Sequence, residues 1–299
     1  MIETPMINNA ISHMNQYQTR PTAFDAIPSP WRGGIYLLAV SLAVLGAISI
    51  ITGDFAFQWQ PVPADLPARA AVARVTGVVE VIACVALLTP RTSQLGTAAV
   101  AAIFWLWFLL LDVPRVVRGE PAAWIGACEL LALAGPSLAL YGTLRSSQRD
   151  LTNDRIGSLS TTVGKLCFAA ALPPLGLSHF IYAEPAAALI PAWFPARLFF
   201  TYLTGVGHIS AGLSLLSGVL ARVAAPLLAL MFGCFIVFLH IPRVIADPSR
   251  YEFTMLTVSL ALSGAAWIVA GVVSSKKSEV HSAIGMNVGR DVSLVTSDE

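Results

Sequence analysis

Long apolar stretches alternate with short polar connections along most of the chain. A helix needs about 20 apolar residues to cross the hydrocarbon core of a bilayer, and eight stretches reach or approach that length. The pattern therefore predicts an all-α integral membrane protein with eight transmembrane helices. They are expected near Ile35–Thr52, Ala68–Leu88, Leu95–Leu111, Ala122–Tyr141, Val163–Tyr182, Leu198–Leu220, Val223–Leu239 and Phe253–Val273.

Polar segments divide the apolar stretches into two groups of four. Residues 1–30 are a polar N-terminal tail without the charged-then-apolar order of a signal peptide. Residues 275–299 are a polar tail, which we expect to be mobile. The one substantial internal polar segment, 144–160, separates a first four-helix unit (31–143) from a second (161–274). We expect this segment to be a cytoplasmic linker.

Prolines predict where two helices end and where one bends. Proline lacks the N–H of a helical hydrogen bond, and its ring clashes with the preceding turn. Pro114 and Pro242 are therefore expected to stop the third and seventh helices, and Pro173-Pro174 to kink the fifth.

The two groups of helices are similar in sequence. Pro63 to Val117 align with Pro191 to Ile245 at a constant offset of 128 without a gap, and 17 of these 55 positions are identical. Self-similarity at a fixed distance indicates a repeated architecture. Because four helices bring the chain back to its starting side, both copies run in the same direction. We therefore expect two parallel four-helix repeats, related by an axis along the membrane normal.

Composition supports the membrane assignment and removes several classes of function. Residues are 56% hydrophobic and 12% charged, whereas soluble domains average about 25% charged. A net charge of +1 gives no reason to expect nucleic acid as a partner. The four cysteines stand singly in apolar stretches, and the motifs of nucleotide loops, zinc proteases, serine triads and haem attachment are absent. A self-contained enzyme is therefore not favoured, and enzymatic activity stays an open question.

The distribution of Lys and Arg predicts the orientation. With both termini on one side of the membrane, that side collects 11 of these residues and the opposite side 7. Positive residues are enriched on the cytoplasmic side. Both termini are therefore expected in the cytoplasm.

Several segments resemble the DoxX family of four-helix bacterial membrane proteins, here present as a tandem pair. They are GDFAFQWQPVP (53–63), SHFIYAEPAAALIPAWFP (178–195), YLTGVGHISAGLSLL (202–216) and LHIPRV (239–244). The resemblance implies the plasma (inner) membrane of a bacterium. Some relatives are membrane subunits of quinone-linked sulfur oxidoreductases, which implies a quinone and a soluble redox partner. The family commonly places an acid after the Thr-Gly pair of the second helix, where this chain has His208.

At three aligned places one repeat has an acid and the other a histidine. The offset of 128 pairs Glu80 with His208 and Asp112 with His240. Upstream, where the second copy is three residues longer, Asp54 aligns with His179. Glu80 and His208 are expected at depth in the membrane, and the other four at the non-cytoplasmic helix ends.

Helix geometry predicts polar stripes that include the two deep residues. Positions 69, 76 and 80 lie on nearly one line at 100° per residue, and they carry Arg69, Thr76 and Glu80. The second copy presents a corresponding line. Because lipid offers no polar partner, such stripes should face the bundle interior or a wet cavity. The second stripe consists of Arg197, Thr201, Thr204 and His208.

These residues allow several kinds of site. Carboxylates and imidazoles can relay protons to a quinone, since an unperturbed imidazole titrates near pH 6.5. They can also bind a metal ion, but His208 lies about 16 Å along its helix from Arg197, which would separate it from rim histidines. Interfacial hydrogen bonding would be a purely structural role. A fourth possibility is an anionic head group held by Arg69, Arg115, Arg197 and Arg243.

Glu129, in the middle of the fourth predicted helix, is a further candidate. We expect it to be a structural acid, either protonated or paired with Arg74. Two functions remain in competition for the chain as a whole. One is a DoxX-like membrane component of a redox or quinone-linked process that acts with a partner. The other is a small-solute transporter or membrane scaffold without catalytic activity.

Overall fold

The computed structural model describes residues 25, 27–148 and 154–295, with side chains except those of Gln58, Gln148 and 275–295. The predicted N-terminal tail up to residue 24 lies outside the described residues, which contain helices and no strand. The α-helices are α2 (Gly33–Thr52), α3 (Arg69–Leu88), α4 (Ser93–Trp107), α5 (Val113–Val117), α6 (Ala123–Gln148), α7 (Arg155–Ile181), α8 (Ala183–Leu189), α9 (Arg197–Ser217), α10 (Ala221–Phe235), α11 (Ile241–Ala246) and α12 (Arg250–Val295).

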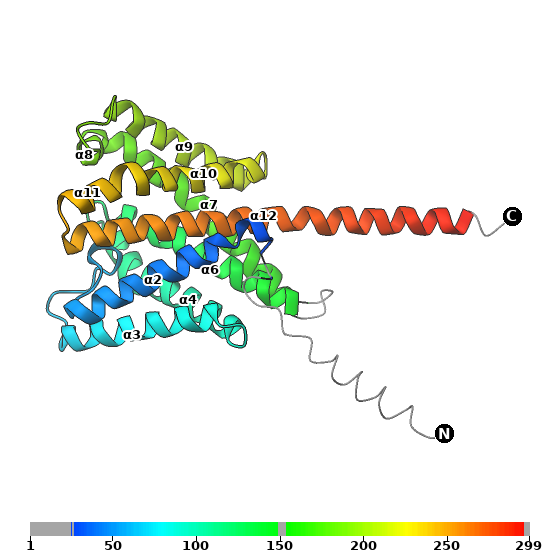
Figure 1. The fold of residues 1–299 in the computed structure, drawn as a ribbon, viewed down its shortest axis with the longest axis horizontal. Helices are drawn as coiled ribbons and strands as arrows, with labels where there is room; N and C mark the ends of the chain where they lie inside the picture. The colour runs from blue at the N-terminus through cyan, green and yellow to red at the C-terminus, as the bar shows by residue number, and fades with distance from the viewer. Residues whose placement is uncertain (1–24, 26, 149–153, 296–299) are drawn as a thin grey trace, which may run out of the picture.

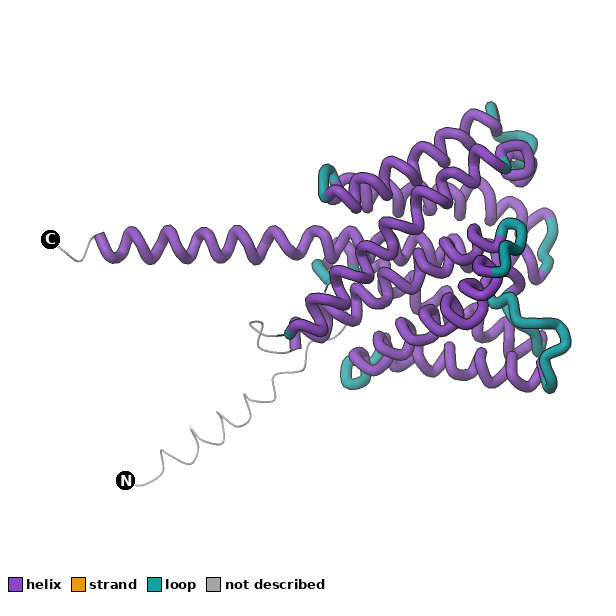
Figure 2. The backbone as a smooth tube through the Cα atoms, turned by 180° about the vertical axis from the view of Figure 1, so that it is seen from behind, coloured by secondary structure: helices purple, strands orange, loops and turns teal. Residues whose placement is uncertain are grey.

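Within the described residues, seven helices are long and apolar enough to cross a membrane. The count becomes eight if α7 and α8, which meet at 90°, form one broken span. The prediction of an all-helical, multi-pass membrane protein is therefore confirmed. The end of the bundle with the loops 53–68 and 190–196 is called the loop end, and the end with the turns 89–92 and 218–220 the turn end (Figure 2).

The helices follow one another around a closed ring. Each of α2, α3, α4, α6, α7, α9, α10 and α12 packs against the next, and α12 returns to α2. Helices α6 and α12 also pack across the ring. In Figure 1, α3 and α4 lie on one side of α12, and α9 and α10 lie on the other. The apolar stretch of α12 is 78% buried, compared with 28% in α9, so α12 belongs to the core and α9 to the periphery.

Large apolar side chains cover the outside of the peripheral helices. Val75 and Ile82 on α3 are more than 60% exposed, and Leu227 and Leu230 on α10 are nearly as exposed. Continuous apolar surfaces of this kind are rare on soluble monomers. The outer faces of α3, α9 and α10 therefore suit contact with lipid tails, as expected for membrane-spanning segments.

Pro114 and Pro242 do not end their helices, which corrects the sequence prediction. A π-helical turn precedes each proline, η3 (Phe108–Asp112) and η4 (Ile236–His240), and the short helices α5 and α11 then continue the path. The wider turn removes the clash between a proline ring and the carbonyl of the preceding turn. Each helix therefore extends about two turns beyond the predicted end, at residues 117 and 246.

The fifth predicted helix continues through its two prolines, and the chain bends sharply where the helix ends. Helix α7 includes Pro173 and Pro174 without interruption. The 90° bend lies at Tyr182, between α7 and α8. The prolines therefore do not break the helix, and the chain changes direction at the loop end.

Two polar segments contain more helix than predicted. Helix α6 continues to Gln148 and α7 begins at Arg155, so most of the expected linker 144–160 is helical. Residues 149–153 lie outside the described residues. Helix α12 continues through the predicted C-terminal tail to Val295 and projects from the turn end (Figure 1). A change to polar sequence therefore indicates the end of the apolar, membrane-spanning part of a helix. It does not indicate the end of the helix itself, because a helix can continue into water.

Pairs of glycines bring neighbouring helices into backbone contact. A Cβ added to Gly77 of α3 would lie 2.4 Å from the carbonyl oxygen of Gly46 in α2. Gly205 of α9 faces Gly176 of α7 in the same way, at 2.8 Å. Small residues of this kind allow close helix packing in membranes. A second set of contacts joins Gly34 to Gly264 and Gly135 to Gly164.

Candidate functional site

The loop between α2 and α3 folds into the bundle and supplies two polar partners for buried acids. Gly53 ends α2 in the left-handed region at φ 65°, a conformation that glycine adopts without strain. Ala56, Trp59 and Gln60 then lie buried, at 2–3% exposure. The loop closes on itself, since the N–H of Ala56 donates to Gln60 Oε1 over 2.7 Å. Burial of Phe55, Ala56 and Trp59 removes apolar surface from water, which favours the inserted position of the loop.

Two acids, Glu80 and Glu129, accept hydrogen bonds from this loop, and together with the buried Asp112 they are named the acid centre. Gln60 Nε2 donates to Glu80 Oε1 over 3.0 Å, and Trp59 Nε1 donates to Glu129 Oε2 over 2.6 Å. Glu80 and Asp112 are completely buried. The sequence predicted Glu80 at depth and Asp112 at a helix end. The structure buries both, because the helix continues past Asp112.

The acid centre has few compensating groups. Glu80 Oε2 and both oxygens of Asp112 have no hydrogen-bond partner among the described residues. The nearest cation to Asp112 is Arg115, with its Nη1 3.6 Å from Oδ1. Isolated carboxylate charges are costly in an apolar interior. Glu80 and Asp112 are therefore both buried acids with few partners, and among the described residues Glu80 takes part in no ion pair.

The second half of the chain carries three candidate histidines, His179, His208 and His240, which are named the histidine centre; the contacts described below join His179 to His208. The rings of His179 and His208 stack with their centroids 5.2 Å apart and their planes 25° from parallel. His208 also contacts the ring of Phe232 edge-on at 5.4 Å. His208 and His240 are buried. The sequence placed His179 at the rim and His208 at depth, but the structure brings the two rings together.

Hydrogen bonds to the backbone fix the tautomer of the stacked pair. Nδ1 of His208 lies 3.0 Å from the carbonyl oxygen of Thr204, and Nδ1 of His179 lies 2.9 Å from that of Leu175. Because a carbonyl oxygen only accepts, Nδ1 carries the hydrogen in both rings. Nε2 of each neutral ring is then left with a lone pair that can take up a proton.

The glycine contacts also revise one of the predicted acid–histidine pairs. They relate α2 to α7 by 130 positions, since Gly46 corresponds to Gly176 and Gly34 to Gly164. In that register His179 corresponds to Ser49, whose buried hydroxyl oxygen has no partner among the described residues. The expected match of Asp54 with His179 is therefore not the one that the helix packing gives.

Three of the four candidate arginines form ion pairs at the loop end. Arg69 binds Asp54 at 2.8 Å and the carbonyl oxygens of Val62 and Pro63. Arg115 pairs with Glu120 at 2.8 Å. Arg243 makes a two-point contact with Glu252 and donates to the carbonyl oxygen of Leu189. These contacts hold loops and helix ends. Arg69 binds Asp54 and the loop, whereas Glu80 binds Gln60, so the two ends of the predicted polar stripe have separate partners.

Asp54 joins the two halves of the chain. One carboxylate oxygen faces Arg69, and the other accepts hydrogen bonds from Arg250, the first residue of α12, at 3.2 Å. Partial burial would raise the pKa of Asp54. Hydrogen bonds from the N–H of Phe55 and from the two arginines outweigh burial and hold the pKa below its usual value.

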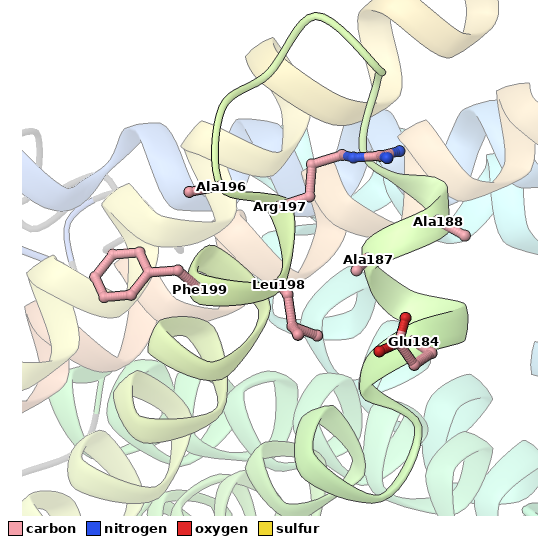
Figure 3. Close-up of a pocket in the computed structure, with 7 residues that line it drawn as sticks. All are labelled: Glu184, Ala187, Ala188, Ala196, Arg197, Leu198 and Phe199. Carbon is pink, nitrogen blue, oxygen red and sulfur yellow. The ribbon is translucent and has the colours of Figure 1, made fainter.

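Arg197 and an acid that the sequence reasoning missed border a cavity of about 430 Å³ (Figure 3). Glu184 of α8 and Arg197 of α9 lie at opposite ends of this cavity, with Ala187 and Ala188 between them. Arg197 has one weak contact, to the carbonyl oxygen of Ile190 at 3.4 Å. The bend at Tyr182, which the sequence did not signal, creates the cavity.

Other assignments also change. Glu129 binds Trp59 rather than Arg74, and Thr76 and Thr201 bond to carbonyls of their own helices. The sequence reasoning missed Trp59 and Gln60. The sequence did contain one indication of these two residues, because the connection between the first two predicted helices is rich in aromatic residues and poor in charges. Among the described residues, no group of three or more His, Cys, Asp or Glu side chains has an arrangement that could hold a metal ion.

No protein-family model, curated protein or solved structure matches the chain.

Proposed function

We propose that the protein is a DoxX-like component of a bacterial plasma membrane, built from two parallel four-helix repeats (31–143 and 161–274) with both termini in the cytoplasm. Several element boundaries 128 residues apart support the duplication. Helices α4 and α10 begin at Ser93 and Ala221, and the π-helical turns end at Asp112 and His240. Ala68 and Ala196 both adopt the left-handed conformation just before a helix.

The proposed role is proton exchange in a redox or quinone-linked process. Reduction of a quinone to a quinol consumes electrons and an equal number of protons. A soluble redox partner would supply the electrons, and the centres of this chain would supply the protons. The stacked His179–His208 pair carries the proposal, since His208 is buried and His179 half-buried, their tautomers are fixed and their Nε2 atoms can exchange protons. Intramembrane ionisable groups are functional candidates by default.

Quinone content and a quinone-dependent optical change test this role. Purified wild-type protein should retain quinone and show an absorbance change when quinone is added. Glu80→Gln and His208→Ala should lose the change by more than tenfold. Asp65→Asn, at an exposed loop acid, and His281→Ala, beyond the apolar part of α12, are the matched controls. Absence of quinone and of any optical change in the wild-type protein would contradict the role.

Transport of a small solute is the second candidate, and the inserted loop favours it. Non-helical backbone at membrane depth occurs where it is buried in protein or lines a cavity, and transporters build binding sites from such segments. Here the loop brings Trp59 and Gln60 to the acid centre. Solute flux into proteoliposomes, reduced at least tenfold by Gln60→Leu and Glu80→Gln but not by Asp65→Asn, would support transport. If the protein is a scaffold, these variants should alter neither the quinone-dependent absorbance change nor the solute flux.

A further inference from the structure

A second cavity lies at the turn end, away from the acid and histidine centres. Its volume is about 680 Å³, within the range of small-molecule sites. The walls come from α7, from the turn between α9 and α10, and from α12. Leu166, Leu216 and Val273 are among the apolar lining residues.

Among the described residues, the side chains that line this cavity include two cations and no acid. Lys165 of α7 and Arg222 of α10 both contribute to the wall, together with the hydroxyl-bearing residues Thr162 and Ser217. Arg222 is exposed and takes part in no ion pair among the described residues. The cavity therefore presents positive charge beside an apolar surface, which is complementary to an anion with hydrocarbon attached.

The position of the cavity fits the membrane interface. Helix α9 ends at Ser217 and α10 begins at Ala221, so the cavity lies where two membrane-spanning helices meet the aqueous side. This end is the one proposed to face the cytoplasm. Basic pockets between transmembrane helices on that side bind anionic head groups.

The corresponding place in the first half lacks both cations. The offset of 128 matches Arg222 with Gln94, and the glycine register of 130 matches Lys165 with Ile35. The turn 89–92 of the first half carries one exposed cation, Arg91, at a position that the offset of 128 matches with Val219. The two turns therefore differ in where their positive charge lies, and the combination of Lys165 and Arg222 is particular to the second half.

We infer that this cavity binds the phosphate head group of an anionic phospholipid, with Lys165 and Arg222 on the phosphate and an acyl chain against Leu166, Leu216 and Val273. The inference goes beyond the proposed redox role and does not depend on it. Each cation near a membrane surface contributes about 1 kcal/mol to the attraction of anionic lipid, which corresponds to about a fivefold change in affinity.

Lipid binding to the delipidated full-length protein tests the site. Native mass spectrometry and the thermal midpoint should show binding of phosphatidylglycerol in preference to phosphatidylcholine. Arg222→Gln should weaken phosphatidylglycerol binding about fivefold, and Arg222→Lys should restore most of it. Arg91→Gln changes an exposed arginine on the other turn and should leave the affinity unchanged.

Three outcomes would overturn the inference. Equal binding of the two lipids by the wild-type protein would remove the requirement for an anionic head group. Binding of inorganic phosphate as tightly as the lipid would identify a site for free anions. Equal losses in Arg222→Gln and Arg91→Gln, with helical content and monodispersity unchanged, would show a general surface charge effect instead of a cavity.

Discussion

Glu80 and Glu129 each receive one hydrogen bond from a neighbouring side chain of the inserted loop, Gln60 and Trp59. The loop therefore determines how each acid is held, although the acids stand on helices. His179 and His208 differ, since both bond to carbonyls of their own helices and meet only ring to ring. At the residue scale, one half of the chain holds its polar groups with a loop and the other half with helix backbone.

The bond from Trp59 to Glu129 should contribute measurably to stability. Its removal leaves an acceptor on the half-buried Glu129 without its partner, which costs about 1–3 kcal/mol. A double-mutant cycle of Trp59→Phe and Glu129→Leu, followed by unfolding in detergent, should give a coupling energy of at least about 1 kcal/mol. Trp105→Phe is the control, because the N–H of this buried indole has no partner among the described residues. An equal coupling energy in the control cycle of Trp105→Phe and Glu129→Leu would contradict the hydrogen bond from Trp59 to Glu129.

The Asp54 contacts predict a pH dependence. Its folded-state pKa is lowered, so its stabilisation is complete above the unfolded pKa of about 3.9 and is lost as the pH falls through the folded value. The side chains are partly exposed, so the effect should be about 1 kcal/mol or less. Asp54→Asn should have a lower thermal midpoint than wild type at pH 7, and the difference between the two midpoints should shrink as the pH falls below about 4. A difference that does not shrink with falling pH would exclude this carboxylate as the cause.

Elements in the two halves share their irregular features. A π-helical turn precedes both Pro114 and Pro242, and a glycine pair joins the first helix to the second in each half. These features determine where the helices cross and place Asp112 and His240 on the buried side. At the element scale, the centres depend on close packing at the glycines.

Alanine at a crossing glycine should destabilise the bundle. In Gly77→Ala the new methyl group would meet the backbone of Gly46 at 2.4 Å, and helices must separate at a cost of about 1–3 kcal/mol. Gly233→Ala is the control, since no atom lies within 4 Å of its added Cβ. That change should stabilise α10 by about 0.5–1 kcal/mol. Unfolding midpoints of both variants check the prediction, and equal shifts would contradict it.

The hydrophobic pattern predicted the spans well because membrane helices need one uninterrupted apolar length. It failed where geometry depends on neighbours. Pro114 is accommodated by a π-helical turn, the chain turns by 90° at Tyr182, and α6 and α12 continue through polar sequence. Periodicity reports burial and length, but it contains no information on how a turn relaxes around a proline.

The candidate residues were predicted in part. Glu80 and His208 are buried as expected from their depth. Arg69 binds the loop instead of joining a stripe, and the stacking of His179 on His208 was not expected. Partners such as Trp59 come from a connection whose path is fixed by tertiary packing, so helix geometry alone could not assign them.

At the scale of the whole molecule, eight of the helices in the described residues form one ring, to which each half of the chain contributes four. Helix α2 packs against α12 and α7 against α6, so the first helix of one half meets the last helix of the other. Helix α12, with 46 residues, is about 69 Å long at 1.5 Å per residue, about twice the thickness of the hydrocarbon core. Its polar end must therefore extend well beyond the membrane.

Thiol labelling of intact cells tests the orientation. In a background without the four native cysteines, Asp65→Cys at the loop end should react with a membrane-impermeant reagent added outside. Ser147→Cys, at the end of α6, should react only after the cells are permeabilised. Both residues are exposed, so accessibility within the protein does not confound the result. The opposite pattern would place both termini outside the cytoplasm.

The central claim is that the acid and histidine centres exchange protons when a quinone is reduced. Infrared difference spectroscopy during electrochemical reduction of added quinone measures this directly in the purified protein. The wild-type spectrum should contain a carboxyl band that is lost in Glu80→Gln and an imidazole band that is lost in His208→Ala, with both retained in Asp65→Asn. Identical difference spectra for the wild-type protein and all three variants would contradict the claim.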